Sequence, residues 1–368
     1  MMSLDAHERP PEHIRNVYKK FQKLRGDALN SDPELLDLRH STAVDQLHVV
    51  RSIAPADLRA TFQDFVATTA GRNSFALLDT PLPVYEHGHM PGRRNTFDES
   101  PLRLLILLGL LIIPSLFPDC IQRPLLSRLI HRDLANPAHQ TNVHLHYHVP
   151  YPPESSSFFE HPPSSEPHFL PKDPEIHKPL SMTQFLNRKL RWVTLGGQYD
   201  WTRKVYPSTT PPPFPSDVGA LLKGVFPDMT AQAAIVNFYS PGDTLSMHRD
   251  VSEECDRGLV SVSIGCDGIF VIGRNGDPTE ESSANSQPPP EVLVLRLRSG
   301  DAVYMSGESR FAWHGVPQII PDTCPEWLRD WPASSQPPES AGADDLYQQW
   351  KGWMRTKRVN VNVRQMWE

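Results

Sequence analysis

The chain has 368 residues, of which 39% are hydrophobic and 38 are proline. This length suits one large domain with irregular additions, and so much proline predicts many loops around a smaller ordered core. The formal net charge of -7 excludes a generally basic surface, so any binding of nucleic acid must depend on local patches.

The four cysteines, Cys120, Cys255, Cys266 and Cys324, are far apart and form no CxxC pair. This distribution argues against a zinc ribbon and a disulfide framework, and it is typical of a reducing compartment. The N-terminus mixes acidic and basic residues without an apolar core, which does not resemble a secretory signal. We therefore expect an intracellular protein, in the nucleus or cytoplasm rather than the mitochondrion.

Residues 1–100 are expected to form a helical extension that is partly irregular. HIRNVYKKFQKLR carries apolar residues at helical spacing from Ile14 to Leu24. The basic residues between them indicate a solvated helix face, with a contact to nucleic acid as the alternative. SDPELLDL predicts a second helix, with Ser31 or Asp32 as its N-cap and a proline at its first position.

Residues 101–230 are expected to supply a lid and outer elements. The apolar run 102–117 contains an arginine and a proline and is shorter than a membrane span, so it predicts a buried strand or helix. Three stretches rich in proline and serine have the composition of surface loops, at 149–180, 276–291 and 331–345.

Residues 231–368 are expected to form the β-structured core. Short segments rich in β-branched and aromatic residues follow one another with little helix between them. They are QAAIVNFYS, LVSVSIGCDGIFVIG, EVLVLRLRSGDAVYMSG, FAWHGVPQII and KRVNVNVRQMW. This succession favours an antiparallel barrel or sandwich. The chain as a whole is therefore predicted to be an α+β protein whose N-terminal half is mainly helical.

A metal site is predicted around NFYSPGDTLSMHRD. In an extended chain His248 and Asp250 point to the same side, so both can reach one ion. His314, in the later segment RFAWHGVPQII, offers a third ligand. Two histidines and one carboxylate form the facial triad of non-haem Fe(II) oxygenases, which leaves positions open for other ligands.

Other histidines compete with this assignment. HLHYHVP offers His144, His146 and His148, and EHGHM offers His87 and His89. Both groups lack a carboxylate partner and a β-barrel context, which makes them weaker candidates.

The last strand carries a polar face. RVNVNVR places Arg358, Asn360, Asn362 and Arg364 at period two, so all four project from one side. If that side faces a barrel interior, an anionic ligand is needed to offset the burial of these groups, and arginine binds carboxylates well. An edge strand with solvated arginines is the alternative.

These motifs together resemble the AlkB family of Fe(II)/2-oxoglutarate-dependent dioxygenases. The family pattern is Asn-x-Tyr, His-x-Asp, a distal His, and Arg-x-Asn-x-Thr-x-Arg, and Asn362 stands here in place of the Thr. LRWVTLGGQYDWT and GLLIIPSLFP further resemble the eukaryotic subfamily of the first AlkB homologue. The resemblance implies a double-stranded β-helix, or jelly-roll, core with N-terminal helices and a nucleotide-recognition lid.

The resemblance also implies roles for individual residues. His248, Asp250 and His314 would bind Fe(II). The co-substrate 2-oxoglutarate, used together with O2, would contact a second set: Asn237, Tyr239, Arg358, Asn360 and Arg364. In bacterial relatives an acidic residue after the HxD touches the base; Ser252 and Glu253 lie in that loop here, so base preference does not transfer.

The lid would carry aromatic residues for stacking on a flipped base, namely Trp192, Tyr199 and Trp201, although core aromatics are the alternative. Basic residues around them suit phosphate contacts or a solvated face: Arg188, Lys189, Arg191, Arg203 and Lys204.

The implied activity is oxidative demethylation, or oxidation, of methylated bases in DNA or tRNA, with release of succinate, CO2 and formaldehyde. The alternatives are a dioxygenase acting on methylated protein such as histone, and a non-catalytic module of the same fold that binds nucleic acid. Nucleic acid is the expected partner, no membrane is expected, and the expected state is a monomer.

Overall fold

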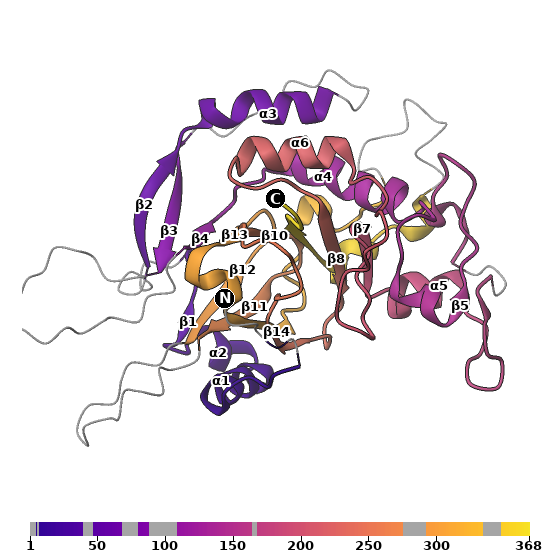
Figure 1. The fold of residues 1–368 in the computed structure, drawn as a ribbon, viewed down its shortest axis with the longest axis horizontal. Coiled ribbons are helices and arrows are strands. Elements are labelled where there is room, and N and C mark those ends of the chain that lie inside the picture. The colour runs from indigo at the N-terminus through magenta and orange to yellow at the C-terminus, as the bar shows by residue number, and fades with distance from the viewer. Residues whose placement is uncertain are drawn as a thin grey trace, which may run out of the picture.

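The computed structural model describes residue 5 and residues 7–39, 47–67, 80–87, 109–163, 168–274, 292–333 and 347–368. Two sheets lie at its centre, with helices on both sides (Figure 1). One sheet has eight strands in the order β2-β3-β4-β13-β10-β15-β8-β7, and the other has five in the order β1-β12-β11-β14-β9.

The last eight strands form the core, and four of them lie in each sheet. The larger sheet holds β8 (Ala233–Tyr239), β10 (Leu259–Gly265), β13 (Ala302–Met305) and β15 (Arg358–Arg364). The smaller sheet holds β9 (Leu245–His248), β11 (Gly268–Gly273), β12 (Val292–Leu297) and β14 (Trp313–Ile319). All neighbouring pairs among them are antiparallel. This is the predicted jelly-roll, and every segment predicted as a strand contributes to it.

Strands also occur in the half of the chain that was predicted to be mainly helical. The larger sheet is extended by β2 (Leu47–Ile53), β3 (Leu82–His87), β4 (Leu110–Ile113) and β7 (Trp192–Gly196). β4, from the apolar run, pairs with β13, and β7 pairs with β8. These segments are strands because the edges of the core sheet offer them backbone partners.

The second predicted helix is wrong. A short helix, α2 (Gly26–Asn30), ends before Ser31, and the residues after Pro33 form β1 (Leu35–Leu36). β1 pairs in parallel with β12, so pairing with the sheet overrides the local helix signal. Asp32 does not cap a helix there: it accepts a hydrogen bond from Glu34 N at 3.0 Å and forms an ion pair with Lys20.

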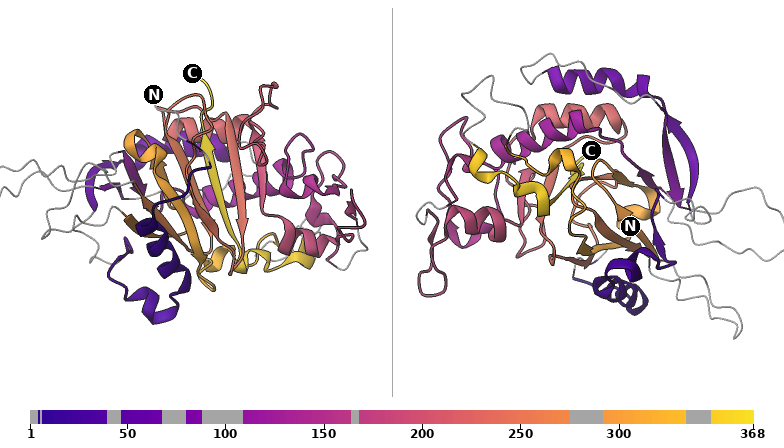
Figure 2. Two further views of the ribbon diagram at one scale, coloured as in Figure 1. Left: turned by 60° about the horizontal axis from the view of Figure 1, so that its bottom comes forward. Right: turned by 180° about the vertical axis from the view of Figure 1, so that it is seen from behind.

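Helices cover both sides of the core. α3 (Pro55–Ala67), α4 (Asp119–Ser127) and α6 (Ser216–Val225) lie together on one side, and α1 (Glu12–Lys23) lies on the opposite side with α2 (Figures 1 and 2). α1 confirms the first predicted helix. It packs on β14 and β11 and buries Ile14 and Phe21 against Val271 and Trp313. The N-terminal segment therefore covers the smaller sheet.

Short elements make up the rest of the described chain. They are β5 (Tyr147–His148), β6 (Leu170–Pro171), α5 (Met182–Gln184), the π-helical turns Arg128–Asp133 and Phe185–Lys189, and the 3-10 turns Asn142–Leu145, Phe158–Glu160, Gly307–Phe311, Glu326–Leu328, Gln348–Trp350 and Trp353–Thr356. Within the described ranges no helix has both the length and the apolar character needed to cross a bilayer.

An aromatic cluster joins these turns. The ring of His131 stacks on Tyr347 at 4.5 Å and on Trp331 at 5.0 Å, and its Nδ1 lies 2.7 Å from Ser157 Oγ. Burial lowers the pKa of His131 to about 4. The imidazole is therefore a neutral packing group at neutral pH.

Some predictions fall outside the described residues. They concern parts of the N-terminal extension, including His89, residues 102–108 of the apolar run, 164–167 of the first loop, the whole loop at 276–291, and 334–345 of the third loop.

Candidate metal and 2-oxoglutarate site

The three predicted metal ligands meet at one end of the jelly-roll. His248 ends β9 and lies opposite His314 of β14, and Asp250 follows two residues later. Asp250 Oδ1 is 3.8 Å from His248 Nε2, and Asp250 Oδ2 is 3.8 Å from His314 Nε2. The ligand atoms all lie within 4.8 Å of one another. One ion could contact all three.

Both histidines are oriented by the backbone. The Nδ1 atom of His248 is 2.9 Å from Ser246 O, and that of His314 is 3.0 Å from Ala312 O. If each Nδ1 donates to its carbonyl, the lone pair of each Nε2 points to the shared position. Burial lowers the pKa of His314 to about 4, which keeps this imidazole neutral, the form that binds a metal.

Arg364 holds the carboxylate ligand. Burial opposes ionisation of Asp250, but the charge of Arg364 and the two histidines outweigh this, and the pKa of Asp250 falls below its usual range. Arg364 Nη2 donates to Asp250 Oδ2 at 3.1 Å, while Arg364 Nη1 donates to the Tyr206 hydroxyl at 3.3 Å. This arrangement keeps the carboxylate ionised and fixes its direction.

A second buried arginine completes the cluster. Glu253 lies between Arg364 and Arg310, with Oε1 3.2 Å from Arg364 Nη1 and Oε2 3.0 Å from Arg310 Nη2. The side chains of Arg310 and Glu253 are 0% and 2% exposed, so water does not screen these charges. Arg310 also donates to the backbone carbonyl of Asp250 at 2.8 Å. The loop that carries the HxD is thus tied to two guanidinium groups.

Arg358 crosses the interior between the sheets. It donates from Nη1 to Cys266 O at 3.0 Å and from Nη2 to Ser263 Oγ at 2.7 Å. Gly268 makes room for it, because a Cβ there would come within 2.8 Å of Arg358 Nε. All four polar residues of the last strand face inward, which excludes the edge-strand alternative.

One atom of this arginine and one of its neighbour on β8 are buried polar groups that lack a hydrogen-bond partner among the described residues. Arg358 Nε and the hydroxyl of Tyr239 are buried without a hydrogen bond to any described residue. The two residues lie opposite each other on β15 and β8. Such atoms are costly to bury unpaired, and a carboxylate would accept from both. This end of the interior therefore fits the distal carboxylate of 2-oxoglutarate.

The amides of the predicted set have different surroundings. Asn360 donates to Ser261 Oγ at 2.9 Å and to Val262 O at 3.1 Å, so its NH2 group is already bonded within the protein. Asn237 and Asn362 line a cavity of about 370 Å³ that also contains His248 and Asp250. Direct contact of Asn237 and Asn360 with 2-oxoglutarate stays a prediction.

The aromatic lid residues form one cluster but face two cavities. Tyr199 and Trp201 line the cavity of His248 and Asp250, which we call the catalytic cavity. Trp192 does not line it; its ring stacks on Trp201 with centroids 4.9 Å apart and lines a neighbouring cavity. Tyr199 and Trp201 line both cavities.

Each of the two cavities is lined by one basic residue of the lid segment. Lys204 lines the catalytic cavity and Arg203 lines its neighbour. Arg191 forms an ion pair with Asp243. Arg188 and Lys189 are exposed, as expected of residues on a solvated face.

The rival histidine groups do not assemble. Among the described residues, His248, Asp250 and His314 are the one group of three or more metal-ligating side chains close enough to share an ion. His144 instead approaches the backbone carbonyl of Thr141, and His146 packs on His177 with ring centroids 4.7 Å apart. The close spacing of HLHYHVP reflects local packing.

Two contributors to the site, Arg310 and Tyr206, carry no recognisable pattern in the sequence, and a third, Glu253, has a structural role there. Arg310 lies in a 3-10 turn before β14, and its partners are 53–60 residues away in the chain. Tyr206 reaches Arg364 from the lid. Glu253 was considered for base contact, but its carboxylate is engaged by the two arginines. Ser252 is also engaged, since its hydroxyl donates to Lys204 O at 2.9 Å.

Comparison with known proteins gives consistent results. The family model of the 2OG-Fe(II) oxygenase superfamily matches residues 143–364. The chain is 46% identical to the N6-methyladenosine RNA demethylase ALKB1 of Pyricularia oryzae, over 100% of this chain and 99% of that protein. It is 55% identical to the N6-methyladenosine RNA demethylase ALKBH of Cryphonectria parasitica, over 61% of this chain and 99% of that protein. It is 38% identical to the tRNA demethylase abh1 of Schizosaccharomyces pombe, over 70% of this chain and 79% of that protein.

Proposed function

Because the chain belongs to the AlkB family within the 2OG-Fe(II) oxygenase superfamily, we propose that it removes the N6-methyl group of methylated adenosine in RNA. The enzyme is a dioxygenase that uses Fe(II), 2-oxoglutarate and O2. Demethylation of nucleic acid is common to its relatives, and the choice of RNA and of this modification follows the relative that matches the whole chain.

One observation carries the proposal: two of the three metal ligands and an aromatic wall line the same cavity. His248 and Asp250 lie in it together with Tyr199 and Trp201. A base that has left its stack needs an aromatic surface to rest on, and the N-methyl group must reach the metal. The size of about 370 Å³ is at the small end of the range for ligand sites and favours a single base.

His248, Asp250 and His314 would hold Fe(II), which together with 2-oxoglutarate and O2 would supply the oxidation that converts the N-methyl carbon to formaldehyde. The chain's own residues position the reactants. Arg358 and Tyr239 offer unpaired donors for the far carboxylate of 2-oxoglutarate. Arg364 keeps Asp250 ionised and in place. The apolar surfaces of Tyr199 and Trp201 exclude water from the side of the base.

The proposal is tested by mass spectrometry and formaldehyde release on three methylated substrates. They are single-stranded RNA with N6-methyladenosine, methylated tRNA, and DNA with N6-methyladenine, and a methylated histone peptide is assayed beside them. We expect turnover of the RNA and loss of turnover in His248→Ala. His177→Ala, a histidine outside the site, is the matched control. Preferential release from tRNA or DNA would redirect the substrate assignment, and release from a methylated histone peptide alone would refute the nucleic-acid function.

The monomeric state and the nuclear or cytoplasmic location stay predictions. Size-exclusion chromatography with light scattering tests the first, and imaging of the tagged protein tests the second.

A further inference from the structure

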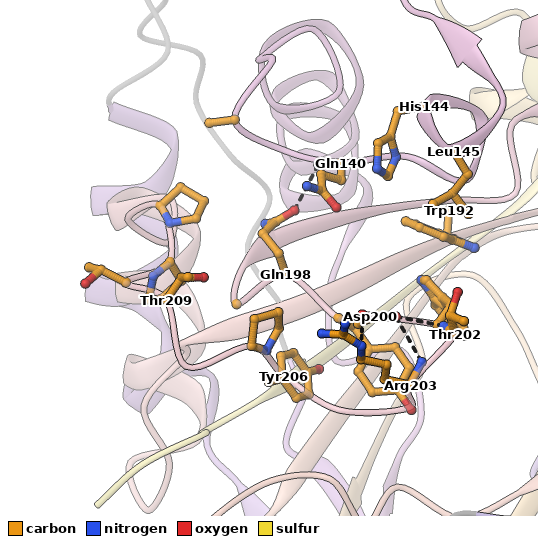
Figure 3. A pocket seen from close by; sticks show the side chains of 18 of the residues that line it. Gln140, His144, Leu145, Trp192, Gln198, Asp200, Thr202, Arg203, Tyr206 and Thr209 are labelled. Carbon is orange, nitrogen blue, oxygen red and sulfur yellow. Dashed lines mark hydrogen bonds and ion pairs between the residues drawn. The ribbon is translucent and has the colours of Figure 1, made fainter. Parts of the chain in front are cut away.

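A second cavity adjoins the catalytic cavity across the aromatic lid. It has a volume of about 770 Å³ and is lined in part by Trp192, Trp201, Tyr206 and Arg203 (Figure 3). Tyr199 and Trp201 line both cavities. The two spaces are therefore neighbours that share a wall of two aromatic side chains.

The wall has the chemistry of a stacking site. Trp192 and Trp201 stack at 4.9 Å, and Trp201 is 38% exposed, so part of its ring is open to a ligand. Tyr199 meets Trp201 edge to face at 5.0 Å. Aromatic faces of this kind bind nucleobases with little regard to sequence.

Consecutive basic residues flank the wall, one for each cavity. Arg203 lines the second cavity, with a side chain that is 81% exposed, and Lys204 lines the catalytic cavity. If adjacent nucleotides occupied the two cavities, the phosphodiester between them would lie at the boundary of the cavities, where these positive charges can contact it. Asp200 also lines the second cavity, where its carboxylate accepts hydrogen bonds from the amides of Thr202 and Arg203. Its Oδ2 is also 3.9 Å from Arg203 Nε, an exposed ion pair of the weak kind that a phosphate can replace.

The Gln198 amide in the lining of the second cavity is already bonded within the protein. It accepts from Gln140 N at 3.0 Å and from Thr194 Oγ1, and it donates to Gly196 O at 2.8 Å. This amide therefore supports the lining of the cavity. The features that favour a nucleotide there are the stacking surface and the positive charge.

We propose that the second cavity binds the nucleotide adjacent to the methylated one in a single-stranded RNA. The inference rests on the proposed function and extends it from one nucleotide to two. Tyr206 lies between the cavities as well: it lines the second cavity, and its hydroxyl accepts from Arg364, which holds Asp250. A nucleotide in the second cavity would therefore lie one side chain away from the carboxylate ligand.

The test compares equilibrium binding of one and two nucleotides, followed by the intrinsic fluorescence of the tryptophans. The mononucleotide probe is N6-methyladenosine monophosphate. The two dinucleotide probes carry one unmodified adenosine, attached on the 5′ side of the methylated nucleotide in one and on the 3′ side in the other. The wild-type protein should bind at least one dinucleotide roughly tenfold more tightly than the mononucleotide, in line with stacking of one extra base.

Two variants remove that gain by different routes. Ala138 is exposed on the lining of the second cavity, and Ala138→Trp fills it; Arg203→Glu reverses the charge. Both variants should lose the extra affinity for the dinucleotide and keep the wild-type affinity for the mononucleotide. The controls are Ile176→Trp, at a 72% exposed position, and Arg59→Glu, on the exposed face of α3; both should behave as wild type.

Equal affinity of the wild type for one and two nucleotides would overturn the inference, as would a gain that survives in both variants. Formaldehyde is measured in the same samples. A dinucleotide gain without formaldehyde release would leave the second cavity assigned and would count against the demethylase function alone.

Discussion

Replacing Glu253 with glutamine perturbs the charge cluster behind the metal site and leaves the side-chain volume almost unchanged. In the wild type two buried guanidinium groups, of Arg310 and Arg364, face the carboxylates of Glu253 and Asp250. Glu253→Gln leaves the two arginines with one carboxylate. The uncompensated positive charge then lies beside the ligand that must attract a cation.

The size of the expected effect of Glu253→Gln follows from the burial of these charged groups. Removing one partner of a buried ion pair costs about 3–5 kcal/mol, because the remaining charge stays out of water. Glutamine can still accept a hydrogen bond from one arginine, so we expect the unfolding free energy to fall by about 3 kcal/mol. Residues that orient metal ligands contribute about 10–100-fold to metal affinity, and a loss in that range is expected for Fe(II).

The assay combines urea unfolding of the metal-free protein with anaerobic Fe(II) titration. Glu254→Gln is the matched control, since Glu254 is the exposed neighbour. If Glu253→Gln unfolded within about 0.5 kcal/mol of the control and bound Fe(II) equally well, the cluster would not support the site, and the reasoning from buried charge would be refuted.

Three further predictions concern other parts of the molecule. Arg358→Ala should raise the half-saturating 2-oxoglutarate concentration roughly ten- to hundredfold, as expected for a lost charge-assisted hydrogen bond; an unchanged value in turnover assays would place the carboxylate elsewhere. Phe21→Ala should lower the unfolding free energy by about 3–5 kcal/mol, because Phe21 is fully buried under the smaller sheet; denaturant unfolding within about 1 kcal/mol of wild type would contradict that packing. The folded-state pKa of His131, about 4, lies below its unfolded value, so the unfolded state binds the proton first and stability falls as pH drops from about 6.5 to about 4, by at most about 3 kcal/mol. His131→Phe keeps the ring stack and should flatten that part of the stability profile, whereas an equal slope in both proteins would show that other groups cause it.

Local periodicity in the sequence was sufficient to predict the residues at the centre of the site. The alternation in RVNVNVR placed Arg358 and Arg364 on one face, as strand geometry requires. The HxD also placed two ligands near each other, although only His248 lies in a strand and Asp250 follows it in the loop. Whether that face lay inside or outside depended on β15 having neighbours on both sides, which only the register shows.

The remaining features depend on contacts between distant segments. SDPELLDL has a good helix start, yet Leu35 and Leu36 pair with β12, some 260 residues away. The ion pairs of Arg310 and the division of the lid aromatics between two cavities likewise arise from tertiary packing. No pattern within a short window of sequence encodes these contacts.

The position of β15 has a consequence for how the protein is made. This strand is the last of the described chain, yet it lies in the middle of the larger sheet, bonded to β10 on one side and β8 on the other. A chain that lacks β15 therefore has a larger sheet that is split between β10 and β8, and it also lacks Arg358 and Arg364. The oxidising site is incomplete until this strand has been made and has paired on both sides.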